Sequence, residues 1–324
     1  MYFSKIVSTG SYLPEKIISN DDLSKVVDTN DEWIVSRSGI GNRRFSHDEN
    51  TSRLAANAAR NILGKINKSP EEVDLIIVAS VSADYITPSV ACLVQAEIGA
   101  VNAVAFDVNA ACTGFVFALS TADKFIKSGV YRNALVIGAE VLSKYLDFND
   151  RSTCVLFGDG AAGVFIERSE EETGLIAEIL GSDGAKGMSL TGGYSPVVNV
   201  FNDGEKNYDI YIKMDGKAIF DFATRKVPKC VKELMEKAGI DNGDIDYVLP
   251  HQANSRIVEI ISRKLKIPMD KFYINMYNYG NTSSASIPIA LNEMAEKGYL
   301  KEGTKLVICG FGAGLTWGAA YLKF

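Results

Sequence analysis

The sequence lacks any apolar run long enough to span a membrane, and it lacks an excess of positive charge. Its 324 residues include 34 Lys and Arg against 40 Asp and Glu, which gives a formal net charge of −6. Nucleic-acid binding needs clustered positive charge, so this balance argues against a nucleic-acid partner. The apolar run at the start, within residues 1–7, is too short for a signal peptide. We therefore expect a cytoplasmic protein without a membrane segment.

Cysteine and histidine are also scarce. The five cysteines are odd in number, scattered, and form no CxxC pair, so the sequence signals neither a disulfide framework nor a zinc site. We expect free thiols and no bound metal. Of the two histidines, His47 lies in a polar run typical of the surface, whereas His251 directly follows an apolar segment.

Short apolar runs alternate with helical patterns along the whole chain. Residues 75–79, 134–138, 155–157 and 305–309 are among the predicted buried strands, and 53–63 and 113–127 among the predicted helices. This alternation predicts an α/β architecture. The polar, Gly-rich stretch 181–207 is the best candidate for a surface excursion.

Similar motifs recur in the two parts of the chain. Asp74 and Asp246 each precede an apolar strand, and the offset between them in the sequence is the same as that between Leu119 and Leu291. We therefore expect two similar halves, residues 1–170 carrying Cys112 and residues 171–324 carrying His251 and Asn281. A site between such halves collects residues from both.

Cys112 lies after a predicted strand and at the start of an apolar helix. The positive end of a helix favours thiolate over thiol, and a thiolate attacks thioesters well. The small neighbours Ala110, Ala111 and Gly114 leave room for a substrate. A buried structural cysteine at the same junction is the alternative interpretation.

Three more turns carry polar or flexible residues. His251 stands at a strand end, where α/β folds bind ligands, although an exposed loop histidine is the alternative. Asn281 opens a helix, where its amide either donates to a carbonyl oxygen that becomes negative or caps the helix. The glycines of residues 310–318 either bring backbone N–H groups to an oxyanion or form a plain tight turn.

In combination, these motifs resemble the β-ketoacyl-acyl-carrier-protein synthase III family of the thiolase superfamily. The resemblance covers essentially the whole chain, through residues 10–14, 33–40, 107–115, 150–160, the His251 and Asn281 segments, and 310–318. It implies an α/β fold of duplicated, five-layered α-β-α-β-α architecture that is active as a homodimer.

The resemblance also implies a mechanism, in which the family's Cys–His–Asn set maps onto Cys112, His251 and Asn281. Cys112 would take an acyl group from acyl-CoA, with backbone N–H groups of Cys112, Ala313 and Gly314 stabilising the oxyanion. The histidine and asparagine would then stabilise the enolate formed when malonyl-acyl carrier protein loses CO₂, and this carbanion would attack the acyl group. No metal or redox cofactor is implied. An asparagine in place of a second histidine resembles the primer-using synthases.

Three binding regions follow from the same resemblance. CoA would bind with its adenine on Trp33, Arg151 nearby on the other face, and its phosphates on Arg37. An acidic carrier protein would be attracted by a basic helix after His251. The residues implied at this surface are Gln252, Ala253, Asn254, Ser255, Arg256, Arg263 and Lys264, and those of the acyl pocket are Thr87, Leu142 and Phe157.

The chain departs from the family pattern at three positions. Thr87 stands where several relatives carry a Phe that reaches into the partner subunit's acyl pocket, which favours a longer or branched primer here. Asp221 replaces a carrier-contacting lysine of some relatives, and Ser38 replaces a threonine. Two alternatives stay open: a related synthase or acyltransferase of specialised metabolism, and a non-catalytic acyl-CoA- or carrier-binding subunit. The intact Cys–His–Asn set argues against the second.

Overall fold

The computed structural model describes residues 2–202, 204–205 and 207–324. Nine strands form the main sheet in the order β11-β12-β13-β8-β1-β7-β6-β4-β5. Their bounds are β1 (Phe3–Tyr12), β4 (Leu75–Ala79), β5 (Val104–Val108), β6 (Asn133–Glu140), β7 (Gly160–Ser169), β8 (Gly174–Ser182), β11 (Tyr247–Pro250), β12 (Lys305–Gly312) and β13 (Thr316–Lys323). Two short pairs are separate: β2 (Ile17–Ser19) with β3 (Asn42–Arg44), and β9 (Leu190–Thr191) with β10 (Lys213–Met214).

Helices cover the sheet on both faces. The α-helices are α1 (Asn20–Leu23), α2 (Asp31–Ser38), α3 (Thr51–Lys65), α4 (Val90–Ile98), α5 (Gly114–Lys127), α6 (Gly216–Ala238), α7 (Ser255–Leu265), α8 (Met276–Tyr279) and α9 (Ser286–Glu296). Short 3₁₀ turns are η1 (Pro70–Glu72), η2 (Ala111–Thr113), η3 (Leu142–Tyr145), η4 (Gly184–Ser189), η5 (Met269–Lys271) and η6 (Ser283–Ala285). In the part of the chain that the structure describes, no helix is long and apolar enough to cross a membrane.

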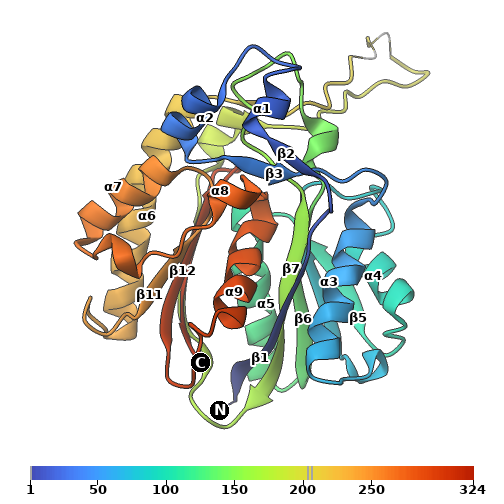
Figure 1. The fold of residues 1–324 in the computed structure, drawn as a ribbon. Coiled ribbons are helices and arrows are strands. Elements are labelled where there is room, and N and C mark those ends of the chain that lie inside the picture. The colour runs from blue at the N-terminus through green and yellow to red at the C-terminus, as the bar shows by residue number, and fades with distance from the viewer. Residues whose placement is uncertain (1, 203, 206) are drawn as a thin grey trace.

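Five layers are visible in Figure 1. Helices α6 and α7 lie outside β11 and β12, helices α5 and α9 fill the centre, and α3 and α4 cover β6 and β5 on the other side (Figure 1). Burial explains why the strands read as continuous apolar runs, since all residues of β4 and β6 are buried. The predicted five-layered α/β architecture is confirmed.

The strand pairing repeats between the two halves. Strand β6 is parallel to β4 and antiparallel to β7, which is antiparallel to β1; β12 has the same relation to β11, β13 and β8. The turn at η2 has its counterpart at η6, because Ala111 and Ser283, related by the same sequence offset as Asp74 and Asp246, both have a φ of 47°. The pairing between β1 and β8 is confined to Ser4 and Gly174 in these two described strands. The predicted division at residue 170 falls in the turn between β7 and β8.

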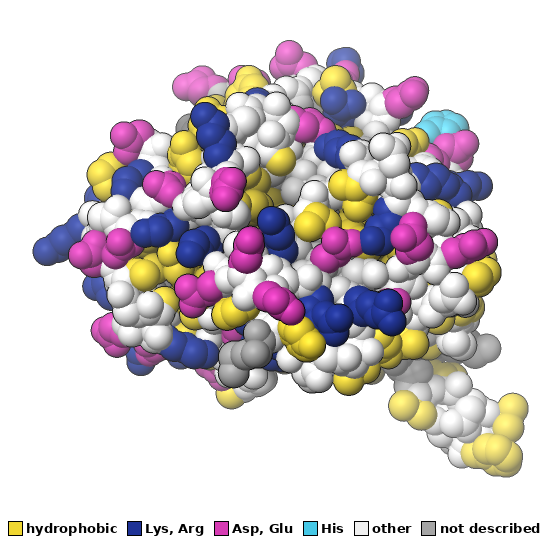
Figure 2. Space-filling view, turned by 90° about the horizontal axis from the view of Figure 1, so that it is seen from below, with side chains coloured by type: hydrophobic (Ala, Val, Ile, Leu, Met, Phe, Trp, Pro, Cys, Tyr) yellow, Lys and Arg dark blue, Asp and Glu magenta, His cyan; other side chains and the backbone are white. Residues whose placement is uncertain are grey.

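The surface excursion begins later than predicted. Gly181 and Ser182 still belong to β8, where they pair with Trp317 and Thr316. The chain then leaves the body as a long loop between β9 and β10 (Figure 1), with Val200 and Phe201 almost fully exposed. On the face seen in Figure 2, basic and acidic side chains are interspersed, and apolar side chains gather on the protruding loop.

Candidate active site

The Cys112 turn is formed by backbone that only small residues fit. Cys112 lies in η2 between β5 and α5, with a side chain that is 6% exposed. Ala111 before it adopts the left-handed conformation that makes the turn sharp. Gly312 at the end of β12 lies directly against the turn, because a Cβ there would come within 2.8 Å of Cys112 Cβ and 3.2 Å of its Sγ. The backbone of the C-terminal half therefore abuts the thiol.

The predicted oxyanion donors lie just beyond this contact. Ala313 follows Gly312 and is half-buried, whereas Gly314 is exposed. Thr316 ties the segment to the Cys112 turn, since its Oγ1 donates to Ala110 O at 3.1 Å and lies 2.9 Å from Ala313 O. This places Ala313 closer than Gly314 to the end of β12 that meets the thiol.

The resting thiol is protonated. Burial raises the pKa of Cys112 to about 12, the Ser283 hydroxyl lowers it, and the negative charge of an ionised Glu140 raises it further. We had expected the helix start to favour thiolate, and in the resting protein desolvation outweighs that effect. Burial in the resting protein therefore favours the thiol form of Cys112 over the thiolate.

His251 is held as a neutral ring by its neighbours. It follows β11, is 1% exposed, and packs its ring edge against Phe311 at a centroid distance of 5.2 Å. Its Nδ1 lies 2.6 Å from Ser286 Oγ, which also accepts the Gln252 N–H at 3.4 Å. The Ser286 hydroxyl can donate its hydrogen to Nδ1 or accept one from it, so this contact orients the ring and is compatible with either tautomer. When Ser286 donates to Nδ1, the ring hydrogen is on Nε2, which is then a donor.

The burial of His251 predicts a pH dependence of folding. Desolvation lowers the pKa of His251 from 6.5 to about 3. The neutral ring therefore contributes stability that is fully present above pH 6.5 and is lost as the pH falls toward 3, because the unfolded chain takes up a proton in this window. Wild type should lose about 1.4 kcal/mol per pH unit more than His251→Asn within that range.

Urea unfolding between pH 4 and 7 measures this slope. The exposed His47 supplies the matched control, since His47→Asn removes a histidine without removing a buried one. Equal slopes for wild type and His251→Asn would contradict a buried neutral ring.

Asn281 is oriented by the backbone around it. Its N–H donates to Leu156 O at 2.8 Å, and its carbonyl accepts the Gly158 N–H at 3.0 Å. The side-chain Oδ1 accepts the Ser283 N–H at 2.9 Å. A backbone N–H only donates, so the atom facing it is the amide oxygen, and the amide nitrogen is left to donate elsewhere.

The three turns converge on one place. The η2 turn of Cys112 packs against η6, which follows Asn281, and against the end of β12. His251 joins them through Phe311, the residue before Gly312. The predicted cysteine, histidine and asparagine thus come from both halves of the chain and meet between α5 and α9.

The predicted CoA residues lie together at the surface. Trp33 of α2 is half-buried, with the Arg37 guanidinium 4.8 Å and the Arg151 guanidinium 5.1 Å from its ring centre. Arg151 donates to Asp28 O at 3.0 Å. Two positive groups beside an indole suit a ligand with an aromatic ring and phosphates.

The predicted carrier surface is confined to part of its segment. Arg256 and Arg263 of α7 are exposed, and Lys264, also exposed, donates to Thr224 O at 2.9 Å. Gln252 is 1% exposed and bonds to Pro250 O and the Asn275 N–H inside the fold. The Gln252 side chain is thus turned into the fold, and the carrier contact stays a prediction that its burial does not support.

Asn254 connects the two binding regions. Its Oδ1 accepts the Arg256 N–H at 3.0 Å as the N-cap of α7, and its Nδ2 donates to Arg37 O at 2.9 Å. Ser255 packs so closely on Gly39 that a Cβ there would lie 2.7 Å from its Oγ. Ala253 is half-buried. The predicted CoA and carrier residues therefore adjoin one another.

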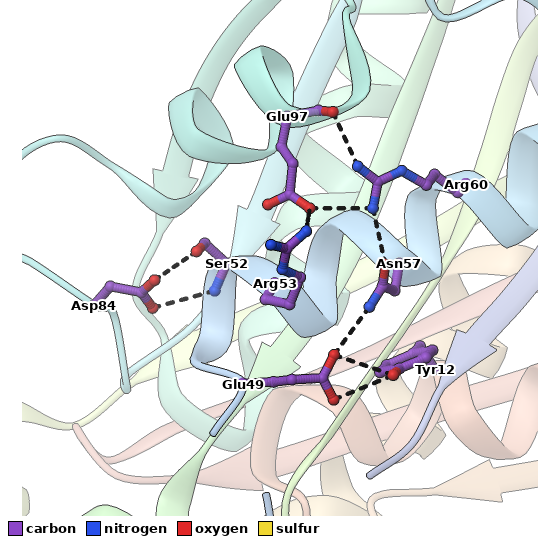
Figure 3. A network of polar contacts seen from close by, with 8 residues as sticks. All are labelled: Tyr12, Glu49, Ser52, Arg53, Asn57, Arg60, Asp84 and Glu97. Atoms are coloured by element: carbon purple, nitrogen blue, oxygen red, sulfur yellow. Dashed lines mark hydrogen bonds and ion pairs between the residues drawn. The ribbon is translucent and has the colours of Figure 1, made fainter. Parts of the chain in front are cut away.

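The predicted acyl-pocket residues are not all together in one chain. Leu142 and Phe157 are buried in the same core cluster, whereas Thr87 is exposed. The loop that carries Thr87 is anchored at Asp84, which accepts the Ser52 N–H at 3.1 Å and its hydroxyl at the start of α3 (Figure 3). Thr87 therefore lies away from the core cluster that holds Leu142 and Phe157.

Sequence reasoning missed the serines around Asn281. Ser283, Ser284 and Ser286 are buried, and each holds a different part of the site. The sequence feature that indicates these serines is a run of small polar residues at the start of an apolar helix. Capping the helix alone would need only one such residue.

Comparison with known proteins places the chain in a family. Residues 106–184 match the family described as 3-oxoacyl-[acyl-carrier-protein] synthase III, and residues 235–324 match its C-terminal part. The β-ketoacyl-[acyl-carrier-protein] synthase III of Clostridium acetobutylicum is 55% identical, covering 99% of this chain and 98% of the relative. That of Lactococcus lactis subsp. lactis is 53% identical, with 100% of both chains covered.

Solved structures of similar proteins have the same fold as this chain. The 3-oxoacyl-[acyl-carrier-protein] synthase III of Aquifex aeolicus superposes with a TM-score of 0.92 at 45% identity, covering 99% of this chain and 100% of that one. The priming β-ketosynthase of the R1128 polyketide pathway gives 0.92 at 33% identity, covering 99% and 96%. The chain belongs to the 3-oxoacyl-[acyl-carrier-protein] synthase III family of acyl-transferring condensing enzymes.

Proposed function

We propose that this enzyme transfers an acyl group from acyl-CoA to Cys112 and then condenses it with malonyl-acyl carrier protein. The product is a β-ketoacyl-acyl carrier protein, the starting unit of type II fatty-acid synthesis. The observation that carries the proposal is the convergence of a buried thiol, a buried histidine whose ring is oriented by Ser286, and an oriented asparagine amide.

In the first step, the Cys112 sulfur attacks the thioester carbonyl of the acyl-CoA. The carbonyl oxygen becomes negative, and the backbone N–H groups of Cys112 and of Ala313, which follows the Gly312 that abuts the thiol, are the donors that we assign to it. The bond to the CoA sulfur then breaks, and CoA leaves as a thiol carrying the proton that Cys112 lost. The result is an acyl-enzyme and free CoA.

In the second step, the malonyl thioester carbonyl accepts hydrogen bonds from His251 Nε2–H and the Asn281 amide. Loss of CO₂ leaves its electron pair in an enolate, whose oxygen these two donors stabilise. The enolate carbon attacks the acyl-Cys112 carbonyl, and the Cys112 thiolate departs. A histidine with a low pKa suits this role, because it gives a hydrogen bond without releasing its proton.

The adjoining CoA and carrier residues support this sequence of steps. The Asn254 hydrogen bond joins Arg37 to the start of α7, so CoA and the carrier protein would bind in turn at neighbouring surfaces. The exposed Arg256 and Arg263 attract an acidic carrier despite the negative net charge of the chain. No step needs a metal or a redox cofactor, since no electrons are exchanged with a third reactant. A reducing compartment such as the cytoplasm keeps Cys112 a free thiol.

The active form that we propose is a homodimer. Strand β5 ends the main sheet and, within the described chain, pairs only with β4; Val101 just before it and Val104 at its start are 72% and 47% exposed. Tyr85 and Ile86 are exposed in the loop before α4, which contacts β5. An apolar sheet edge is a surface for pairing with a second copy.

Intact-mass measurement with a series of acyl-CoAs tests the proposed activity. We expect one acyl adduct, and its discharge as a β-ketoacyl product when malonyl-acyl carrier protein is added. Acyl transfer without malonyl decarboxylation would instead favour a related acyltransferase of specialised metabolism.

Thr87→Phe is expected to narrow the range of accepted primers to shorter acyl chains. We expect the exposed Thr87 to reach the acyl pocket across the proposed dimer, where a larger ring removes acyl space. The measurement is the adduct yield across the acyl-CoA series, with Ile86→Phe as the neighbouring exposed control. An unchanged primer range would remove the reason for expecting a roomy pocket.

A further inference from the structure

The duplicated fold carries a second version of the nucleophile turn. The sequence offset that relates Ala111 to Ser283 also relates Cys112 in η2 to Ser284 in η6, and Glu140 to Gly312. Gly312 ends β12 against Cys112, and Glu140 ends β6 against Ser284. Gly312 has no side chain and brings bare backbone to the Cys112 thiol. The corresponding residue of the other half, Glu140, brings a carboxyl group to Ser284.

Glu140 is completely buried, and both of its oxygens have hydrogen-bonding neighbours. Oε2 lies 2.6 Å from the Ser82 hydroxyl, 3.1 Å from Val81 N and 3.3 Å from the Ser80 hydroxyl. Oε1 lies 2.8 Å from Ser284 Oγ and 3.3 Å from Val81 N. Every one of these groups is uncharged, so a negative charge on Glu140 would have no cation in contact among these partners.

The nearest cation interacts with Glu140 through space, and its printed hydrogen bonds go to other acceptors. Lys144 of η3 is the nearby cation, and its ammonium group donates to Asn50 Oδ1 and Ser82 O, at 2.8 Å each, and to Ala83 O at 3.3 Å. Tyr145 and Cys112 also lie near Glu140. A negative charge on Glu140 would raise the pKa of both.

Hydrogen counting at Ser284 gives a proton on Glu140 an acceptor. Ser284 Oγ lies 2.8 Å from Ala79 O and 2.8 Å from Glu140 Oε1. A hydroxyl has one hydrogen, and a backbone carbonyl only accepts. If Ser284 donates to Ala79 O, the second contact needs a hydrogen on Glu140 Oε1. If it donates to Glu140 instead, Ser284 Oγ and Ala79 O face each other at that short distance with no hydrogen between them.

We propose that Glu140 is held in its protonated, neutral form and is a positioning residue, fixing η6 through Ser284 while keeping negative charge away from Cys112. This inference rests on the proposed function only in naming the reaction that the positioning serves. Burial raises the pKa of Glu140, in keeping with a retained proton. Ser283 contacts Asn281, and Ser286 contacts His251. The contact between Glu140 and Ser284 therefore fixes the segment that orients both side chains.

Two substitutions separate the neutral form from the ionised one. Glutamine reproduces a neutral carboxyl with one donor and one acceptor, so Glu140→Gln should keep the wild-type pH profile of Cys112 alkylation by iodoacetamide. If Glu140 is ionised in the wild type, removing its charge should lower the apparent pKa of Cys112 in Glu140→Gln by about one unit or more. Alkylation needs no acyl-CoA or carrier protein, so its outcome is independent of whether the proposed substrates are right.

Glu140→Met tests the positioning. It keeps the size but removes the anchor, and we expect decarboxylation of malonyl-acyl carrier protein to fall about 10-fold to 100-fold, with recovery in Glu140→Gln. If the Met variant does not fold, Ser284→Ala removes the same link with a smaller change. Wild-type decarboxylation in the folded Met variant, or in Ser284→Ala, overturns the positioning role.

Infrared difference spectra give a direct reading. Wild type minus Glu140→Gln at neutral pH should contain the carbonyl band of a protonated carboxyl. A carboxylate band in its place, or a lowered alkylation pKa in Glu140→Gln, overturns the neutral form.

Discussion

Cys112→Ser is expected to eliminate the acyl adduct and to lower turnover by at least about 10³-fold. Serine keeps the shape of the side chain, so its oxygen still faces Gly312, but an alcohol loses its proton far less readily than a thiol. The site offers it no strong base, because His251 Nδ1 is occupied by Ser286 and burial holds the pKa of the ring at about 3.

Intact-mass measurement after incubation with acyl-CoA checks this result. Cys92→Ser is the matched control, because it makes the same chemical change at a partly exposed cysteine on α4. If Cys112→Ser carries as much acyl adduct as the wild type, the acyl group is on another residue and Cys112 is not the nucleophile.

His251→Ala is expected to separate the two steps. Acylation of Cys112 should persist, because its oxyanion donors are backbone groups of the Cys112 and Ala313 region. Decarboxylation of malonyl-acyl carrier protein should fall by about 10²–10³-fold, the usual effect of losing one donor to a developing oxyanion. The two rates are measured separately, as adduct formation and as CO₂ release.

Ser286→Ala gives the corresponding positioning test at the same site. It leaves the imidazole in place but removes the partner of Nδ1, so it should impair CO₂ release less than His251→Ala does. Equal loss of acylation and decarboxylation in His251→Ala would show that the ring acts in both steps.

Much of the architecture follows from local patterns in the sequence. The apolar run 75–79 coincides with β4, and the constant offset between the two halves reappears in the matched φ angles of Ala111 and Ser283. Both succeed for the same reason: a strand covered on both faces must be apolar throughout, and a duplicated turn keeps its geometry.

Other features depend on contacts that no local pattern carries. Residues 155–157 were expected to form a strand, but they lie in a series of turns in which Cys154 N–H donates to Asp150 O, and Phe157 makes only an isolated bridge to Asn281. Gln252 follows a histidine at a strand end, yet its amide is used inside the fold. The thiol pKa depends on burial by the distant Gly312 region, which sequence spacing does not report.

The single link between β1 and β8 has a consequence for how the enzyme fails. Because Ser4–Gly174 is the one pair between these two strands of the main sheet, the central helices and the turns η2 and η6 provide much of the remaining contact between the halves. The reacting groups thus lie where the two halves meet. Any change that separates the halves is therefore expected to abolish activity, even when the fold within each half is kept.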